Sequence, residues 1–157
     1  MNALQKGIAL NTRKISGYVA DVSQDESLFR PYEKVNCLLW NLGHITMVRN
    51  TLIKILSPST KLEIYPSENE LFGRGAVLQS NDAYPSLESI TEYFIKRGEI
   101  LIELLANASA EHLQSEAAIK IGPNPQTNEE LLFFLYNHET EHIGEIKVIK
   151  NIISRLR

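Results

Sequence analysis

Two histidines stand four residues apart near the C-terminal end of the chain, in the segment "FLYNHETEHIGE". On a helix, His138 and His142 would share one face, with Cβ atoms about 5–6 Å apart. Two imidazoles at this spacing can converge on one divalent cation, with Zn–N distances of about 2.0–2.1 Å. The pair therefore predicts a metal site, at what we expect to be the centre of a buried helix face. The apolar members of that face are Leu131, Leu135, Ile146, Ile149 and Ile153.

A third ligand has to come from another part of the chain, and His44 is the natural candidate. It lies midway along a second segment of helical pattern and borders its apolar stripe, with Trp40, Met47 and Val48 at helical spacing. His44 is far from His138 and His142 in sequence, so only folding can bring the three rings together. We predict metal ligation by His44, His138 and His142.

A cation explains why three such rings would be placed among apolar residues. A buried imidazole that lacks a hydrogen-bond partner costs about 1–3 kcal/mol for each unsatisfied group. A metal-bound ring coordinates through one nitrogen and donates through the other to a nearby acceptor. Glu141 and Glu145 each follow one of the paired histidines by three residues, so either is a candidate acceptor, and Glu145 is also a candidate ligand.

A structural interpretation of the same residues stays open, because a histidine on an apolar face is more often a hydrogen-bonded core residue than a ligand. Trp40 and Met47 are candidates to line a pocket beside His44, with core packing as the alternative. His112 is expected to be a solvated surface residue, and Cys37 a buried, inert thiol. No serine is spaced to suggest a nucleophile, so catalytic residues stay unassigned.

Composition limits the possible functions. The chain has 157 residues, a formal net charge of −3 and no cluster of Lys and Arg, which argues against binding to nucleic acid. One cysteine excludes a disulfide within the chain and favours the cytoplasm. The first residues lack the apolar core of a signal peptide. No apolar run approaches the roughly 20 residues that cross a bilayer, so we expect no membrane contact.

Four helices are expected from apolar residues at helical spacing. We place them at about 3–22, 36–56, 86–108 and from 127 to at least 153. Asn36 and Ser86 are the predicted N-caps of the second and third helices, and Ser57-Pro58 is the predicted end of the second. Thr127 and Glu130 form the pattern of a capping box, in which each side chain bonds the other residue's backbone N–H.

The connection from about 59 to 85 is long, irregular and rich in Pro and Gly, which indicates a crossover on the outside of the fold or a functional loop. No alternation of strands and helices is visible. The sequence therefore predicts an all-α protein: a four-helix bundle with a long crossover between its second and third helices, formed as a single domain from 1–157.

Several of these segments together resemble the DinB-like (DinB/YfiT) family of metal-binding four-helix bundle proteins. "LLWNLGHI" at 38–45 resembles the family's Trp/Leu–Gly–His helix, and "HETEHIGEI" at 138–146 is similar to its His-x-x-x-His-x-Gly-Gln pattern. "LFGRGA" and "YPSLESI" resemble its long crossover and the start of its third helix. The sequence departs from the family at Glu145, where Gln is common.

The resemblance implies a zinc or nickel ion held by His44, His138 and His142, with water completing the coordination, and a homodimer. It also implies a metal-dependent thiol S-transferase that joins a low-molecular-weight thiol to a small electrophile. The alternatives are a metal-binding helical module without turnover, in which the ion only stabilises the bundle or reports metal status, and a helical interaction protein without an ion.

Overall fold

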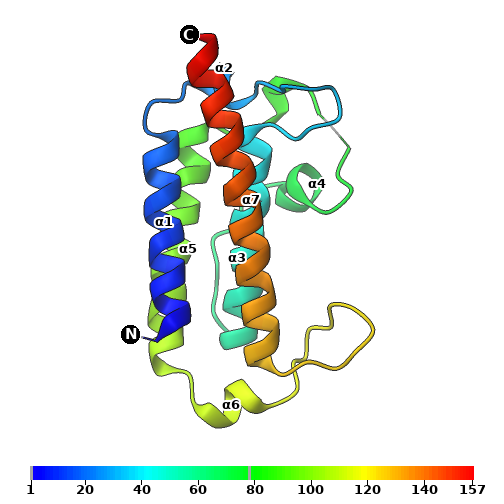
Figure 1. Cartoon of the computed structure of the whole chain (residues 1–157). Helices are drawn as coiled ribbons and strands as arrows, with labels where there is room; N and C mark the ends of the chain where they lie inside the picture. Colours follow the sequence, from blue (N-terminus) through cyan, green and yellow to red (C-terminus); the bar gives the residue numbers. More distant parts are fainter. Residues whose placement is uncertain (1, 78) are drawn as a thin grey trace.

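Four long helices form the body of the protein, as expected. The computed structural model describes residues 2–77 and 79–157. Helices α1 and α7 run in one direction and α3 and α5 in the other (Figure 1). Each of α3 and α1 packs against both α5 and α7. The four helices are α1 (Ala3–Val19), α3 (Leu38–Leu56), α5 (Leu87–Asn107) and α7 (Asn128–Leu156).

The predicted start signals are confirmed for α5 and α7. Ser86 caps α5 by accepting from the Ser89 backbone N–H, and Thr127 and Glu130 form the capping box of α7. The predicted cap of α3 is wrong: the helix begins one residue later, with Cys37 as N-cap and its sulfur accepting from the Trp40 backbone N–H. The apolar stripe is compatible with either start, so periodicity could not separate them.

Because α3 and α5 are parallel, the chain must return along the bundle between them, as the predicted crossover requires. The connections contain short helices that the sequence did not predict, since three to five residues show no period. These are α2 (Gln24–Ser27), α4 (Glu68–Phe72), the 3₁₀-helix η1 (Asn81–Ala83) and α6 (Ala110–Gln114). Helix α1 ends at Val19, three residues before the predicted Val22.

A buried ion pair joins all four long helices. Arg49 of α3 donates two hydrogen bonds of 2.8 Å to the two carboxylate oxygens of Glu139 of α7, and both side chains are fully buried. Asn11 of α1 donates to Glu139, and Arg49 also donates to the backbone carbonyl of Phe94 of α5. The guanidinium lies over the Phe94 ring, 3.4 Å from its centroid.

This polar layer divides the interior. Apolar residues on one side of it form a cluster that includes Leu42, Phe72 and Ile146, and those on the other side form a cluster that includes Leu52 and Leu131. The carboxylate at the centre of this layer belongs to Glu139, the residue directly after His138. The ion pair therefore fixes how α7 is rotated and shifted against α3.

A second buried pair fastens α4 to the bundle. Arg97 of α5 donates to Glu68 of α4 over 2.6 Å, and Asn50 of α3 donates to the other carboxylate oxygen of Glu68. Arg97 also donates to the Thr46 carbonyl of α3. One of the short helices that periodicity could not predict is thus held by charged contacts that are almost fully buried.

Replacing Glu139 by Gln should destabilise the protein by about 3–5 kcal/mol, because it leaves the Arg49 guanidinium charged and without its counter-ion in the interior. The free energy of unfolding from urea denaturation measures the loss. Glu63→Gln is the control, because that carboxylate pairs with Lys96 at the surface, with both side chains more than 60% exposed, and its loss should leave stability close to wild type. A loss below about 1 kcal/mol for Glu139→Gln would show that the pair does not organise the bundle.

Candidate metal centre

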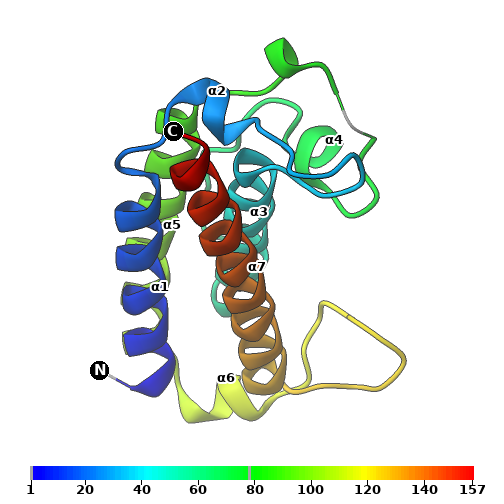
Figure 2. The ribbon, with the colours of Figure 1, turned by 45° about the horizontal axis from the view of Figure 1, so that its top comes forward.

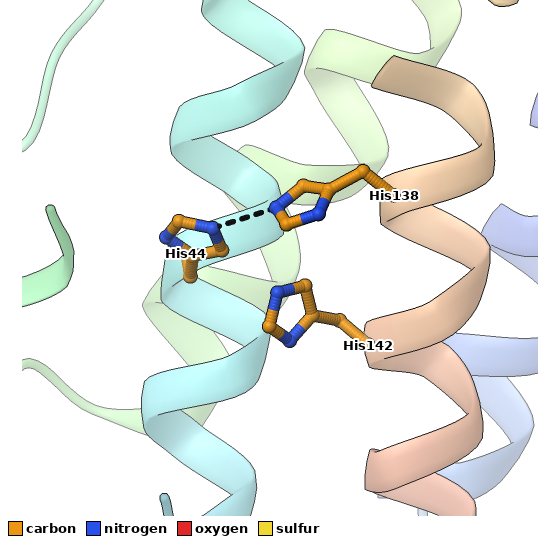
Figure 3. Close-up of side chains that lie close together, drawn as sticks. All are labelled: His44, His138 and His142. Carbon is orange, nitrogen blue, oxygen red and sulfur yellow. Dashed lines mark hydrogen bonds between the residues drawn. The ribbon is translucent and has the colours of Figure 1, made fainter. Parts of the chain in front are cut away.

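The structure brings His44 of α3 together with His138 and His142 of α7. One ring nitrogen of each residue lies within 4.8 Å of the corresponding nitrogens of the other two. The Nε2 atoms of His44 and His138 are 2.9 Å apart. Figure 3 shows the three rings converging on the space between the two helices, with a nitrogen of each directed into it. Two distant segments thus supply one cluster of imidazoles.

His44 is fixed from two sides. Its Nδ1 donates to the Phe72 backbone carbonyl at the end of α4, over 2.7 Å. The Trp40 indole stacks on the ring with centroids 5.0 Å apart and planes 6° from parallel. The absence of a side chain at Gly43 allows this arrangement, since a Cβ there would overlap the Phe72 ring. With Nδ1 protonated, the neutral ring keeps its Nε2 lone pair for a proton donor or a cation.

His142 is held in the same way by acceptors on Nδ1. The Asn41 side-chain oxygen lies 2.8 Å from this nitrogen, and the Glu145 carboxylate lies 3.2 Å from it. A nitrogen that faces two acceptors carries the proton, so the Nε2 of the neutral ring presents its lone pair. Asn41 and His44 are one turn apart on α3, so this helix provides one ligand candidate and also orients another.

The surroundings keep the rings uncharged at neutral pH. Burial, followed by the nearby His44, lowers the pKa of His142 from 6.5 to about 4. Burial is also the main reason why the pKa values of His44 and His138 are lowered. Burial raises the pKa of the Glu145 carboxyl. Neutral imidazole is the form that binds a metal, so protons compete weakly for this site at pH 7.

The cluster opens into a cleft with a volume of about 810 Å³. Trp40, His44, Val48 and Thr51 recur at helical spacing on α3 and form one wall. Phe134, Leu135 and the two histidines of α7 lie opposite. Trp40 therefore lies where a bound molecule would contact it, as expected of a pocket residue.

Met47 lies elsewhere. It is half-buried and is not among the lining residues. Its neighbours at helical spacing are Gly43 and Asn50, which face Phe72 and Glu68 respectively. Met47 thus belongs to the side of α3 covered by the α4 segment, a quarter-turn or so from the cleft.

The predicted environment of the paired histidines is partly wrong. His138 and His142 do not lie at the centre of the buried face of α7; they are half-buried at its edge, and Glu139 and Ile143 occupy the fully buried positions. The edge position is what gives the rings access to the cleft.

Glu141, predicted as an acceptor, is exposed and accepts from Asn137, 2.9 Å away. Glu145 does reach a histidine.

His112 and Cys37 lie outside the cluster. His112 was expected to be solvated, but it is half-buried and its Nε2 is 2.9 Å from the Ile55 carbonyl, which ties α6 to the end of α3. Cys37 is buried, as expected, and burial raises the pKa of its thiol. A thiol that stays protonated in the interior is a poor nucleophile.

Apart from Glu145 and Trp40, the groups that position the rings were not predicted from the sequence. Asn41 had a detectable signal, since it is a polar residue inside an apolar helix, one turn before a histidine. Glu139 had a weaker one, because it follows Leu135 at a spacing of four and so continues the buried row. The Phe72 carbonyl could not be found from sequence, since a backbone group has no residue signature and α4 is too short to show a period.

The three imidazole nitrogens suit a divalent ion with tetrahedral coordination, or one with more coordination positions left open. Zinc at about 2.0–2.1 Å from each nitrogen needs ligand atoms about 3.3 Å apart. The observed separations begin at 2.9 Å and stay within 4.8 Å. Two of the three rings already donate their other N–H to an acceptor, as metal-bound histidines do. The residues present could therefore hold a metal ion.

The metal-free protein should lose stability as the pH falls from about 6.5 towards 4. In this window the unfolded chain binds protons on its histidines, near their ordinary pKa of 6.5, while the folded His142 stays neutral down to about 4. Protonation therefore favours the unfolded state. Urea denaturation of chelator-treated protein at several pH values measures the effect. His142→Gln should show a smaller loss over the same window, and equal losses in both proteins would contradict the assignment.

Comparison with known proteins agrees with the observed fold. The family described as the DinB superfamily matches residues 8–146. The fold is similar to the crystal structure of a DinB-like protein from Bacillus subtilis, with a TM-score of 0.68 and 14% sequence identity over 98% of this chain and 92% of that one. No curated protein matches the chain. The similarity in structure shows a shared fold, and the family match covers most of the sequence, so the chain belongs to the DinB superfamily.

Proposed function

We propose that the protein binds one divalent metal ion, zinc or nickel, through His44, His138 and His142, and that it transfers a small thiol to an electrophile. The observation that carries the proposal is the meeting of three neutral imidazoles from two helices at the wall of a cleft. A purely structural site would be closed by a fourth protein ligand. The geometry favours an open site over that arrangement.

In the proposed reaction a thiol gives its proton to water, and its sulfur forms a bond to an electrophilic carbon. The electrons of the bond that breaks leave with a halide, or stay on the oxygen of an opened epoxide or on the activated alkene, which then takes up a proton. A bound divalent cation would lower the pKa of the thiol and hold the sulfur as thiolate. The chain's own residues orient the ligands: Phe72 and Trp40 fix His44, and Asn41 and Glu145 fix His142. The apolar cleft walls would hold the electrophile and keep water away from it.

Glu145 is the residue that distinguishes this site from the common family pattern. Its carboxylate faces His142 Nδ1, where an amide oxygen could accept the same hydrogen bond. A carboxylate acceptor makes the ring a stronger electron donor than an amide does. We propose that Glu145 supports His142 from outside the coordination sphere and strengthens metal binding.

The remaining expectations rest on the family resemblance and, for the location, on the single cysteine. A homodimer and a cytoplasmic location stay predictions, as does the choice between zinc and nickel. None of the described helices is both long enough and apolar enough to cross a bilayer.

Protein purified without a histidine tag should carry close to one zinc or nickel ion per chain, measured by mass spectrometry of the metal content. His138→Gln should weaken metal affinity by more than about 100-fold, because losing a ligand costs more than the 10–100-fold typical of an outer partner. His112→Gln is the matched control and should keep wild-type affinity. Less than about 0.1 ion per chain after equilibration with metal would favour a metal-free helical protein.

Metal-loaded protein should consume a cytosolic thiol in the presence of a suitable electrophile, and the rate should depend on the metal. The panel pairs several low-molecular-weight thiols with alkyl halides, epoxides and activated alkenes, and free thiol is followed over time. His138→Ala and chelator-treated protein should fall to the rate without enzyme. Stoichiometric metal with no turnover across the panel would make a non-catalytic metal-binding module the better account.

A further inference from the structure

Two cationic side chains lie at the rim of the cleft. Arg74 lies in the crossover, two residues after the end of α4, and Lys120 belongs to the connection between α6 and α7. Both connections project from the same side of the bundle, beside α3 and α7 (Figure 2). Each contains a glycine that also lines the cleft and has a positive φ, 77° at Gly75 and 87° at Gly122. These glycines permit backbone turns that most other residues would strain.

No acidic residue accompanies these cations in the wall. Among the described residues that line the cleft, the charged ones are Arg74 and Lys120, and none is Asp or Glu. This contrasts with the whole chain, which has 19 acidic and 16 basic residues. Glu116 approaches Lys120 only to 3.8 Å, and both side chains are more than 60% exposed, so that pair is weak.

The remainder of the wall is mostly apolar or aromatic. Trp40, Val48, Ile121, Phe134 and Leu135 line the cleft together with the histidines. A molecule that fills this cleft would therefore meet neutral imidazoles at the wall, an apolar surface along its length and positive charge at the rim. Few polar groups that fix orientation beside a largely apolar wall are typical of small-molecule sites.

We infer that the cleft selects amphiphilic anions: small molecules with an apolar body and a carboxylate, sulfonate or phosphate that Arg74 and Lys120 bind. Both cations border the same cleft, and an Arg guanidinium can bind an anionic group through two hydrogen bonds, whereas a Lys ammonium acts as a point charge. This inference names the substrate class of the proposed transferase. It rests on that proposed function only where it says that the bound anion is a substrate. Anion binding itself needs neither metal nor turnover.

Trp40 makes the inference measurable without activity, because it is the only tryptophan in the chain and it lines the cleft. The probe is anilinonaphthalene sulfonate, and its neutral partner is phenylnaphthylamine, which has the same aromatic body without the sulfonate. Energy transfer from Trp40 to each dye gives its affinity in the metal-free and the zinc-loaded protein.

The test variant is Arg74→Glu with Lys120→Glu. The matched control is Lys6→Glu with Arg13→Glu, two exposed residues of α1 that do not line the cleft and whose exchange changes the net charge equally. The test variant should bind the sulfonate dye at least about tenfold more weakly, about 1.4 kcal/mol. The control should keep wild-type affinity, and both variants should bind the neutral dye as wild type does.

Equal affinity for the sulfonate dye in wild type and test variant would overturn the inference. An equal loss of affinity for the sulfonate dye in the control would overturn it too, because the changed net charge of the protein would then explain the effect. Circular dichroism and an unchanged affinity for the neutral dye show that the test variant is folded. The dye results are independent of the proposed function, whose failure would appear as absent metal or absent turnover.

Kinetics then identify which reactant brings the anion. Mercaptohexanoate is compared with mercaptohexanol as the thiol, and chloromethylbenzoate with benzyl chloride as the electrophile. The charged member of one pair should have the lower KM, by about tenfold, and Arg74→Glu with Lys120→Glu should remove the difference. If neither pair shows a difference that depends on these two residues, the anion preference plays no part in substrate selection and the inference is overturned for substrates.

Discussion

The buried ion pair of Arg49 and Glu139 is the contact on which the arrangement of the helices depends. It joins α3 to α7 through two hydrogen bonds and is completed by Asn11 and the Phe94 carbonyl, so every long helix contributes to it. A fully buried carboxylate and guanidinium tolerate little displacement, since either charge left alone in the interior is costly. One relative position of the helices satisfies both groups.

That position also determines the metal centre. Glu139 stands between His138 and His142 on α7, so anchoring it towards the bundle axis turns the two histidines towards α3 and the cleft. His44 completes the cluster because Phe72 and Trp40 hold its ring in one orientation. Phe72 is in turn positioned by α4, which the buried pair of Arg97 and Glu68 fastens to the bundle. Both charged pairs lie outside the cluster, yet they place its parts.

Much of the fold could be predicted from the sequence, because each long helix carries an apolar period and two carry clear caps. The start of α3 could not be assigned correctly, since Asn36 and Cys37 are both compatible with the same stripe. The three-histidine cluster could also be predicted. His138 and His142 are four residues apart on one helix, and His44 lies at the apolar edge of another, so all three were expected to meet between the helices. Glu139 was missed because an apolar-face pattern gives no place to a buried carboxylate whose partner is ninety positions away.

A pocket beside His44 was predicted, but the rim of the cleft could not be, for a different reason. Its rim comes from two connections with no period, and its cations, Arg74 and Lys120, resemble any other exposed basic residues in the sequence. Only the fold shows that they border the same space as the histidines. The contrast is physical: residues within regular helices are placed by local geometry, whereas residues in irregular connections are placed by tertiary contacts such as those of α4.

The account is tested most directly by X-ray diffraction from zinc-loaded crystals at wavelengths on either side of the zinc edge. It predicts one anomalous peak per chain, with a nitrogen of His44, His138 and His142 each about 2.0–2.1 Å from it and at least one position left for water or a thiol. A peak that only two of these rings reach, or zinc bound elsewhere while the three rings remain hydrogen-bonded to one another, would contradict it.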